Sequence, residues 1–395
     1  MKKIGIDQLD LKGKRVLIRV DFNVPLNESL QITDDTRIRA SFPTITYAIE
    51  HGAKVILLSH LGRPKGKVVP EMSLKPASVR LSELLGKSVR MANDCIGEEV
   101  KSEIERMQEG EVLLLENCRF HKGDEENDEA FSRALAELAD IYVNDAFGAA
   151  HRAHASTVGL TRFVPISAAG FLMQKEIEYI KDKIDNPERP FVAIIAGAKV
   201  SDKIGIIEHL MKKADAIIIA GAMSYTFLKA MGRKVGNSLV ENDKLDLARD
   251  TLKKSLDEGI PLYLPIDHVI ADKFANDANR RVVMRGRIPD GWEGMDIGPS
   301  TVELFKGVLE DAKTIVWNGP VGVFEFDNFA KGSNALAKIL AESNAITIVG
   351  GGDCVAAVQK SGYTDKITHI STGGGAALEF MEGKVMPGIE ALSDK

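Results

Sequence analysis

The feature that most constrains this chain is a series of short apolar, β-branched runs that alternate with longer stretches of helical character. In the first half the runs are 15–22, 54–59, 111–115 and 141–143. In the second half they are 191–195, 216–220, 261–265, 314–317, 345–349 and 367–370. Strands that are apolar along their whole length are buried on both faces, so the pattern predicts parallel sheets covered by helices. The predicted fold class is α/β, with two doubly wound parallel sheets.

The stretches between these runs predict the covering helices and a domain boundary. Helical character is clearest at 73–85, 128–139, 202–213, 242–258 and 333–342. A length of 395 residues suits two domains. The segment 173–190, MQKEIEYIKDKIDNPERP, is more polar than its flanks and predicts a charged helix that connects the two domains.

Composition excludes several classes of protein. A net charge of −6 argues against a nucleic-acid binder, although a local basic site remains compatible with it. No apolar run approaches the roughly 18 residues of a membrane span, and the N-terminus lacks the apolar core of a secretory signal. Cys95, Cys118 and Cys354 show neither a CxxC pair nor a Cys/His metal spacing, so a disulfide framework and a structural zinc site are not expected. These features favour a reducing cytoplasm.

Arginines gather near the carboxyl ends of the predicted strands in the first half, which is where open α/β sheets bind ligands. The candidates for an oxyanion pocket are Arg37, His60, Arg63, Arg119 and Arg152. Guanidinium groups match phosphate and carboxylate geometry, so a converging set suits a small, doubly anionic metabolite. The alternative for each arginine is a surface salt bridge.

The end of the first run offers a carboxylate and an amide. Asp21 and Asn23 can hold a substrate hydroxyl, or they can form an Asx-turn that leads into Pro25.

Glycines follow the strands of the second half. Gly350–Gly352 and Gly373–Gly375 each follow an apolar run, and backbone N–H groups at such glycines can cradle a phosphate at a helix start. Tight turns are the alternative. If a helix begins near Ser201, Lys199 and Lys203 can both point at a nucleotide bound by its phosphates at these strand ends. The alternative is that the two lysines lie on an exposed helix face.

Asp353 follows the first of these triplets and is of the type that holds Mg²⁺ beside a phosphate. It can instead cap the helix that follows.

Common nucleotide and metal motifs are absent. The chain has no GxxxxGK[ST] and no GxGxxG, which disfavours a P-loop, a standard dinucleotide site and a protein-kinase glycine loop. His151 and His154 flank Arg152, but no third ligand has a suitable local spacing for a metal site.

Several segments, taken together and in order, resemble the signature segments of phosphoglycerate kinases. These are RVDFNVP (19–25), DDTRIRASFPTI (34–45), SHLGRP (59–64), LLENCRFHKGDEEND (114–128), VNDAFGAAHRAHAST (143–157), GAKVSDKI (197–204), WNGPVGVFE (317–325), GGGD (350–353) and STGGGAALEFMEGK (371–384).

The resemblance implies two Rossmann-like domains separated by a cleft. Residues 1–172 would form the phosphoglycerate-binding domain, 173–189 the connecting helix and 190–381 the nucleotide-binding domain. The tail 382–395 would pack back on the first domain. The reaction implied is reversible phosphoryl transfer between 1,3-bisphosphoglycerate and MgADP, giving 3-phosphoglycerate and MgATP.

The resemblance also implies the site residues. The substrate would be bound by Asp21, Phe22, Asn23, Arg37, His60, Leu61, Gly62, Arg63, Arg119 and Arg152. The nucleotide would be bound by Gly197, Ala198, Lys199, Lys203, Gly221, Asn318, Glu325, Gly351, Gly352, Asp353 and Cys354, with Glu325 on the ribose and Asp353 on Mg²⁺. The catalytic residues implied are Arg37, Lys199, Lys203 and Gly374.

The chain departs from the family pattern at three positions on the nucleotide side. Ala196 and Ala220 stand where glycine is usual, and Cys354 stands where Ser or Thr is usual. A thiol near a phosphate-binding helix start is expected to have a lowered pKa and to react with alkylating agents.

The expected partners are these small-molecule substrates, without nucleic acid or membrane, and the protein is expected to be a cytoplasmic monomer. Two rival hypotheses stay open at this point: a nucleotide-binding dehydrogenase, and a non-catalytic homologue that serves as a binding or scaffold protein.

Overall fold

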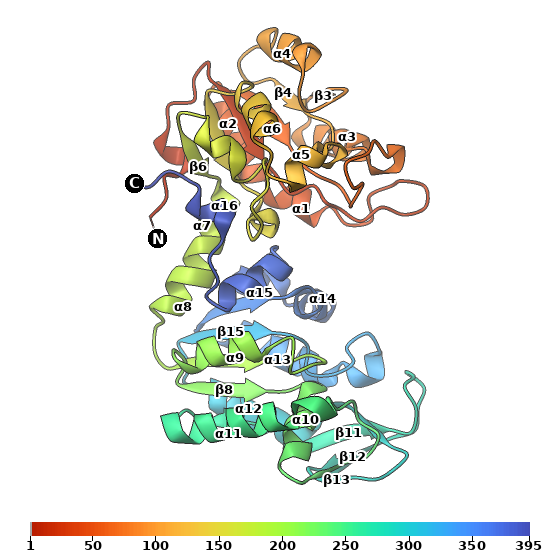
Figure 1. The fold of residues 1–395 in the computed structure, drawn as a ribbon. Coiled ribbons are helices and arrows are strands. Elements are labelled where there is room, and N and C mark those ends of the chain that lie inside the picture. The colour runs from red at the N-terminus through yellow and green to blue at the C-terminus, as the bar shows by residue number, and fades with distance from the viewer. Residues whose placement is uncertain (1) are drawn as a thin grey trace. The chain divides into compact units, whose positions relative to one another are not determined.

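The computed structural model describes residues 2–395, which form two compact units. Unit 1 contains the chain up to Glu178 together with Val385–Lys395, and unit 2 contains Tyr179–Lys384. Figure 1 shows the chain coloured from its N-terminus, with the last segment returning to the sheet of unit 1. The chain therefore enters unit 2 once and leaves it once.

Unit 1 is built on a six-stranded parallel sheet in the order β3-β4-β2-β1-β5-β6. Its strands are β1 (Arg15–Arg19), β2 (Lys54–Leu58), β3 (Val89–Met91), β4 (Val112–Leu114), β5 (Ile141–Asn144) and β6 (Ser167–Ala169). Four of the six were expected from their apolar runs. β3 (VRM) contains an arginine and β6 (SAA) consists of small residues, so neither shows the apolar, β-branched run that marked the equally short β4 (VLL).

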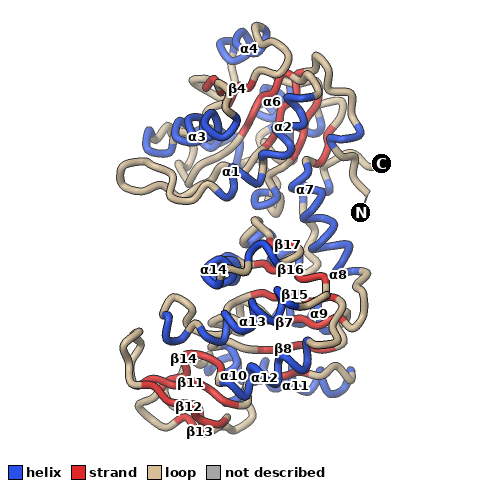
Figure 2. Tube along the Cα trace, turned by 180° about the vertical axis from the view of Figure 1, so that it is seen from behind, coloured by secondary structure: helices blue, strands red, loops and turns tan. Residues whose placement is uncertain are grey.

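Helices flank this sheet on both sides, as the tube in Figure 2 shows. They are α1 (Thr36–Ala40), α2 (Phe42–Glu50), α3 (Lys75–Leu85), α4 (Glu98–Glu105), α5 (Lys122–Glu125), α6 (Glu129–Ala136) and the start of α7 (Phe171–Glu176). Short 3₁₀ helices are Ile6–Gln8, Pro70–Met72, Cys118–Phe120 (η3), Phe147–Ala149 and Gly159–Arg162. One core cluster joins Val16, Ile18 and Leu57 of the sheet to Ile45 of α2 and Leu81 of α3.

The last eleven residues belong to unit 1 through specific bonds. The Lys3 ammonium pairs with Asp394 at 2.8 Å and donates to the Leu392 carbonyl. Asn144 Nδ2 donates to the carbonyl of Gly388, which lies in α16 (Pro387–Glu390). These contacts attach both ends of the chain to the β5–β6 edge.

The two units are joined by one continuous helical segment. It runs from α7 through a π-helical stretch, Ile177–Asp182, to α8 (Lys183–Asp185).

Unit 2 has a second six-stranded parallel sheet, in the order β10-β8-β7-β15-β16-β17. Its strands are β7 (Phe191–Ile195), β8 (Ala216–Ile219), β10 (Leu262–Tyr263), β15 (Thr314–Asn318), β16 (Ile346–Gly350) and β17 (His369–Ile370). Its helices are α9 (Ile204–Met211), α10 (Met223–Ala230), α11 (Leu245–Glu258), α12 (Pro299–Leu309), α13 (Lys331–Glu342), α14 (Gly352–Ser361) and α15 (Gly375–Met381). Short 3₁₀ helices are Asn242–Lys244, Asp327–Phe329 and Thr364–Lys366. Two parallel sheets covered by helices confirm the predicted fold class.

Unit 2 also carries strands that the apolar pattern did not predict. A three-stranded antiparallel sheet has the order β12-β11-β14, and β9 (Lys234–Val235) pairs with β13 (Arg287–Ile288). The three strands are β11 (Asp267–Ala271), β12 (Arg280–Met284) and β14 (Glu293–Ile297). β12 is an exposed edge strand, so it lacks the continuous apolar run that marks the buried parallel strands.

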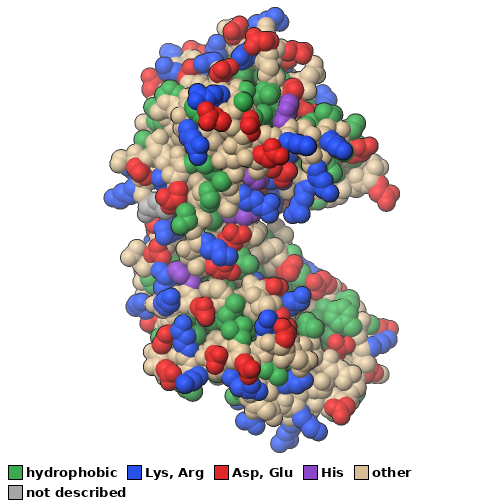
Figure 3. Space-filling view, in the orientation of Figure 1, with side chains coloured by type: hydrophobic (Ala, Val, Ile, Leu, Met, Phe, Trp, Pro, Cys, Tyr) green, Lys and Arg blue, Asp and Glu red, His purple; other side chains and the backbone are tan. Residues whose placement is uncertain are grey.

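The surface carries both signs of charge. In Figure 3, acidic and basic side chains are interspersed over the visible face of each unit. Among residues 2–395, none of the helices combines the length and the apolar character that crossing a bilayer requires.

Candidate functional site

The predicted anion-binding residues of unit 1 follow the carboxyl ends of its parallel strands. β1 is followed by Asp21 and Asn23, β2 by His60 and β4 by Arg119. Strand order reverses between β1 and β5, because the chain proceeds from β1 toward β2 on one side and returns to β5 on the other. Ligands bind at such a reversal in open α/β sheets.

Asp21 and Asn23 are held by two different kinds of contact. Asp21 Oδ1 accepts from the backbone N–H of Asn23 at 3.2 Å, so the Asx-turn considered from the sequence does form. Its other oxygen pairs with Arg37 at 2.8 Å. Asn23 Oδ1 accepts from the Gly62 N–H at 2.9 Å, which ties the segment after β1 to the segment after β2.

Buried cationic and imidazole groups lie behind these residues. His60 Nδ1 lies 3.0 Å from the Arg19 guanidinium. Burial, and then the charge of Arg19, hold the pKa of His60 well below its usual range, so the imidazole is neutral. Burial, and then Arg19, also lower the pKa of Arg119, whose Nη1 donates to the Gly62 carbonyl. An anion bound here would stabilise the charged form of Arg119.

The remaining predicted substrate residues divide into buried and exposed groups. Phe22 is buried and its N–H donates to Ser59 Oγ, while the Leu61 carbonyl accepts from Asn117 Nδ2 at 2.8 Å. The side chains of Arg63 and Arg152 are exposed. The contacts of the described residues bring together Asp21, Asn23, Arg37, His60, Gly62 and Arg119. They do not tie the Arg63 and Arg152 guanidinium groups to that cluster.

Sequence reasoning missed Arg19, which is fully buried at the end of β1. Its Nε donates to Ser156 Oγ at 3.1 Å, and the Ser156 N–H donates to the buried carboxylate of Asp124 at 3.0 Å. The available signal was an arginine inside an apolar strand, RVLIR, where a charge is costly unless it has partners or a ligand.

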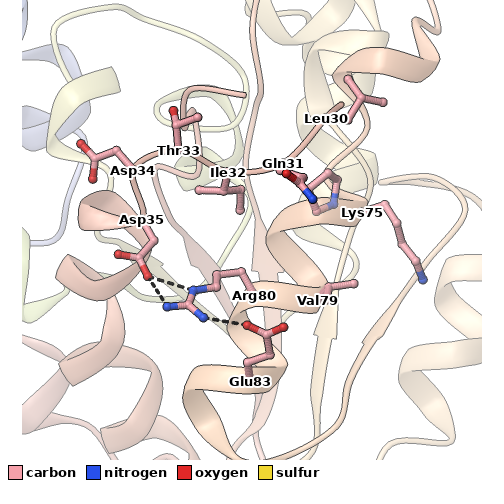
Figure 4. Close-up of a pocket in the computed structure, with 11 residues that line it drawn as sticks. Leu30, Gln31, Ile32, Thr33, Asp34, Asp35, Lys75, Val79, Arg80 and Glu83 are labelled. Carbon is pink, nitrogen blue, oxygen red and sulfur yellow. Dashed lines mark hydrogen bonds and ion pairs between the residues drawn. The ribbon is translucent and has the colours of Figure 1, made fainter. Parts of the chain in front are cut away.

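A cavity of about 730 Å³ lies on unit 1 apart from these residues and is shown in Figure 4. It lies between the chain at 30–35 and α3, and none of the predicted substrate residues is among those that line it. Arg80 on its wall is already paired with Asp35 at 2.8 Å and with Glu83 at 2.7 Å. Its one arginine is thus already neutralised by carboxylates, and Lys75 is the other cation in its lining.

In unit 2, glycines in the left-handed region of φ terminate four neighbouring strands. Gly197 (φ 129°), Gly221 (φ 69°), Gly319 (φ 93°) and Gly351 (φ 91°) follow β7, β8, β15 and β16. A Cβ at Gly319 would lie 1.9 Å from the Ala196 carbonyl oxygen, so only glycine fits there. The direction of strand order reverses between β7 and β15, which places these turns at the expected binding edge.

The turns at Gly197, Gly319 and Gly351 line a cavity of about 460 Å³ with charged groups on its wall. Lys199, Lys203 and Asp353 all contribute to the lining. Lys203 Nζ hydrogen-bonds to Asn318 Oδ1, and Asn318 Nδ2 donates to the Gly350 carbonyl at 2.9 Å. Burial lowers the pKa of Lys203. Glycine backbone, two lysines and two exposed carboxylates, Asp202 and Asp353, together suit a metal-bound polyphosphate.

A neighbouring cavity of about 310 Å³ is mainly apolar in character. It shares Gly197, Ala198, Pro320 and Asp353 with the first cavity, and Glu325 lies on its wall. Its apolar lining includes Leu239, Tyr225, Phe274, Met295 and Val321. None of these five was predicted: four come from segments without a quoted motif, and Val321 lies in the 317–325 segment but was not singled out.

The helix that follows Lys199 begins later than expected, and Gly374 directly precedes another helix. α9 begins at Ile204, with Lys203 as its N-cap residue, and not near Ser201. The chain at 201–203 forms turns instead, and Lys199 is exposed. Gly374 adopts φ 53° directly before α15, and Leu378 of that helix lines the 460 Å³ cavity.

The three departures from the family pattern point into the protein core. Ala196, Ala220 and Cys354 are all fully buried members of one apolar cluster. Cys354 Sγ lies 3.7 Å from the Trp317 carbonyl oxygen, and burial raises the pKa of the thiol far above its usual value. The expected lowered pKa was therefore wrong, because burial outweighs the neighbouring helix start and Lys203.

Asp353 does not cap the helix that follows it, which was the alternative to a metal-binding role. Gly351 is the N-cap residue of α14, and Asp353 lies in the first turn of that helix with an exposed side chain.

Comparison with known proteins agrees with this geometry. The family model for phosphoglycerate kinase matches residues 6–384. The chain is 57% identical over 397 residues to the cytosolic phosphoglycerate kinase of Nicotiana tabacum, covering 100% of this chain and 99% of the relative. The solved phosphoglycerate kinase of Coxiella burnetii is 42% identical, with a TM-score of 0.91 and 98% coverage of both chains. That of Pyrococcus horikoshii is 33% identical, with a TM-score of 0.84 and the same coverage.

A dehydrogenase is thereby excluded, and the resemblance drawn from the motifs is confirmed over nearly the whole chain. The two parallel-sheet units, the cation-rich strand ends of unit 1 and the glycine-lined cavity of unit 2 are consistent with phosphoryl transfer. The chain belongs to the phosphoglycerate kinase family and is a phosphotransferase.

Proposed function

We propose that unit 1 of this phosphoglycerate kinase binds 3-phosphoglycerate and 1,3-bisphosphoglycerate through the residues that follow its strands. Asp21 and Asn23 hold the hydroxyl end. His60, Arg63, Arg119 and Arg152 hold the phosphate that is not transferred. The observation that carries this assignment is the convergence of arginines on the buried His60, where burial and then Arg19 lower the pKa of Arg119 and a bound anion would stabilise its charged form.

Arg37 is assigned to the reacting carboxyl group. Its ion pair with Asp21 at 2.8 Å orients the guanidinium, and about a third of its side chain is exposed to receive a ligand. Lys199 reaches the transferring group from the nucleotide side.

Unit 2 is proposed to bind ATP or ADP across its two adjoining cavities. The phosphates lie in the 460 Å³ cavity against Gly197, Lys203 and Gly351, while the adenosine lies in the 310 Å³ cavity with Glu325 on the ribose. Gly221, Asn318, Gly352 and the backbone of Cys354 complete the phosphate side. Ala198 lines both cavities.

The exposed carboxylate of Asp353 fits a role as the Mg²⁺ ligand, because it lies on the wall of both cavities. When bound, Mg²⁺ neutralises charge on the phosphate oxygens.

The protein's own contribution to the reaction is positioning and charge. The attacking carboxylate is already ionised near neutral pH, so no general base is needed. Arg37 and Lys199 stabilise charge on the equatorial oxygens of the group in transfer, and Gly374 lets the backbone before α15 approach it. An acyl phosphate hydrolyses easily, so water must be excluded during transfer.

The protein is further proposed to act in the cytoplasm as a monomer. A relative at 57% identity is named as cytosolic, and the three cysteines are free thiols. Both substrate-binding sets are carried by one chain, so a second copy is not required.

The test is an assay of the purified protein with 3-phosphoglycerate and MgATP that measures acyl-phosphate formation. Turnover is expected, with loss of activity when Mg²⁺ is chelated and recovery when it is restored. Binding of 3-phosphoglycerate and nucleotide without turnover would instead support the scaffold hypothesis.

A further inference from the structure

Three metal-ligating side chains meet in unit 1 outside the substrate residues. They are Asp94 and Cys95, which follow β3, and His121, which follows η3. One ligand atom from each lies within 4.8 Å of the other two. His121 Nε2 and Asp94 Oδ1 are 2.7 Å apart. The spacing of the cysteines along the chain gave no sign of this cluster, because His121 is distant from Asp94 and Cys95 in the sequence.

We propose that Asp94, Cys95 and His121 form a binding site for a thiophilic divalent cation of the Zn²⁺ class. Zn²⁺ takes sulfur, imidazole nitrogen and carboxylate oxygen at about 2.0–2.3 Å, in a tetrahedral arrangement. Ligand atoms around such an ion lie roughly 3.3–3.7 Å apart. The wider pairs, up to 4.8 Å, must therefore close, and His121 Nε2 and Asp94 Oδ1 must separate from their present 2.7 Å.

The charge of the site matches a divalent ion. A Cys95 thiolate and the Asp94 carboxylate supply two negative charges, and His121 is a neutral ligand. The Cys95 thiol loses its proton on coordination, and that proton passes to solvent. The sulfur ligand selects against Mg²⁺ and Ca²⁺, which prefer oxygen.

The fourth position is open to solvent. The Asp94 side chain is 49% exposed and that of His121 is 32% exposed, whereas Cys95 is fully buried beneath them. An ion can therefore enter from the Asp94 and His121 side, with water as its fourth ligand.

The surroundings already hold the ligands in place. The Asp94 carbonyl accepts from the Glu116 N–H at 3.3 Å, and Asp94 Oδ1 accepts from the Cys95 N–H at 2.6 Å. The His121 ring lies against Phe131, with the ring centroids 5.2 Å apart. The backbone that carries Asp94 and Cys95 is therefore held in place before an ion binds, and the ligand side chains must move.

Binding would link the segment after β3 to η3, the short helix that carries Arg119. A cation that binds the folded state but not the unfolded chain raises the free energy of unfolding with the logarithm of its free concentration above Kd. Zn²⁺ is thus expected to stabilise unit 1 independently of turnover.

The experiment uses the tag-free full chain, stripped of metal and kept reduced with a phosphine. Zn²⁺ is titrated in the presence of excess Mg²⁺, which occupies the oxygen-only sites. One equivalent is expected to bind and to raise the melting temperature. Co²⁺ in place of Zn²⁺ is expected to give a thiolate-to-metal charge-transfer band, a signature that a purely oxygen-ligated ion cannot give.

Matched variants decide which residues ligate. Cys95→Ser and His121→Gln are expected to weaken Zn²⁺ binding at least about tenfold, because losing a ligand costs no less than losing an outer-shell partner. Cys354→Ser and His51→Gln, which change a thiol and an imidazole outside the site, are expected to leave the affinity for Zn²⁺ unchanged. A wild-type protein without the Co²⁺ charge-transfer band, or a Cys95→Ser variant with unchanged Zn²⁺ affinity, would overturn the proposal.

Discussion

At the scale of single residues, the proposed substrate side differs from the rest of the surface in how its charged groups are paired. Asp21 is nearly buried and pairs with Arg37, which keeps part of its surface open to a ligand. Arg39, two residues along α1, pairs with Asp35 at the surface instead. The same helix thus carries one arginine suited to catalysis and one suited to surface pairing.

Arg37→Ala is expected to lower kcat by about 10²–10³, the usual cost of removing one group that stabilises transition-state charge. Nucleotide affinity should survive, because the nucleotide residues belong to unit 2. The measurements are steady-state kinetics and nucleotide titration. Arg39→Ala is the control, and it should behave like wild type because exposed pairs contribute roughly 0–1 kcal/mol. Equal losses in both variants would contradict the assignment.

The cysteines provide a second test at this scale. All three are buried free thiols, and burial raises the pKa of Cys95, Cys118 and Cys354. The native protein is expected to react slowly with an alkylating agent at neutral pH and to expose three reactive thiols in denaturant. Rapid modification of Cys354 in the native state, with protection by MgATP, would show that the thiol faces the nucleotide.

At the scale of secondary-structure elements, the turns after strands and the first turns of helices determine where backbone and side-chain groups of the sites lie. Gly221 follows β8 with φ 69°, and a Cβ there would lie 2.6 Å from the Gly197 nitrogen and 2.7 Å from its carbonyl oxygen. Two strand ends of the nucleotide site are therefore packed backbone against backbone.

Gly221→Ala is expected to weaken MgATP binding at least about tenfold, because the β7 turn must move and the φ is strained for a side chain. Gly307→Ala, within α12, is the control, since a Cβ there meets nothing within 4 Å. It should raise the free energy of unfolding by about 0.4–1 kcal/mol without changing nucleotide binding. Calorimetric titration and denaturant unfolding distinguish the two effects.

The start of α7 depends on a buried carboxyl group. Asp145 Oδ1 accepts from the N–H groups of Leu172 and Met173 at 3.0 and 3.2 Å. Burial raises the pKa of Asp145 to about 6. The folded state therefore holds this proton more tightly than the unfolded chain, whose Asp pKa is about 4.

Because the folded pKa is raised, the contribution of Asp145 to stability is fully present below about pH 4 and is lost as pH rises toward 6. The loss corresponds to roughly 3 kcal/mol. Asp145→Asn keeps an acceptor for α7 and should remove this part of the pH dependence. The test compares urea unfolding of wild type and variant at several pH values between 4 and 7.5. Parallel pH profiles would show that Asp145 is not the titrating group.

At the scale of the whole molecule, the division into two units separates the two proposed sets of substrate-binding residues. Unit 1 carries Asp21, Arg37 and Arg119, and unit 2 carries Lys199, Lys203 and Asp353. Transfer requires the two substrates to meet, so both units must contribute residues to the reactive state.

Both substrates together are therefore expected to lower the radius of gyration more than either alone. Small-angle scattering of the free protein, the two binary complexes and a ternary complex with a non-hydrolysable nucleotide gives the comparison. An unchanged ternary value would contradict this expectation.

Much of the architecture could be predicted because parallel strands must be apolar on both faces, which leaves a local pattern. The runs at 191–195 and 54–59 therefore correspond closely to β7 and β2. The strand ends follow directly, so Asp21, His60 and Arg119 could be found as candidates without a structure. The exposed strand β12 left no such pattern and was missed.

By itself, the sequence determined the fold class, the family and the residue types at each strand end, since these depend on local periodicity and on ordered motifs. Only the tertiary structure decided which groups meet. Arg19 contacts His60, Cys354 turns into the core, and Asp94 and Cys95 face His121. Each of these contacts joins segments that are distant along the chain or depends on which way a side chain packs. No local pattern records either, because packing and burial are properties of the folded chain.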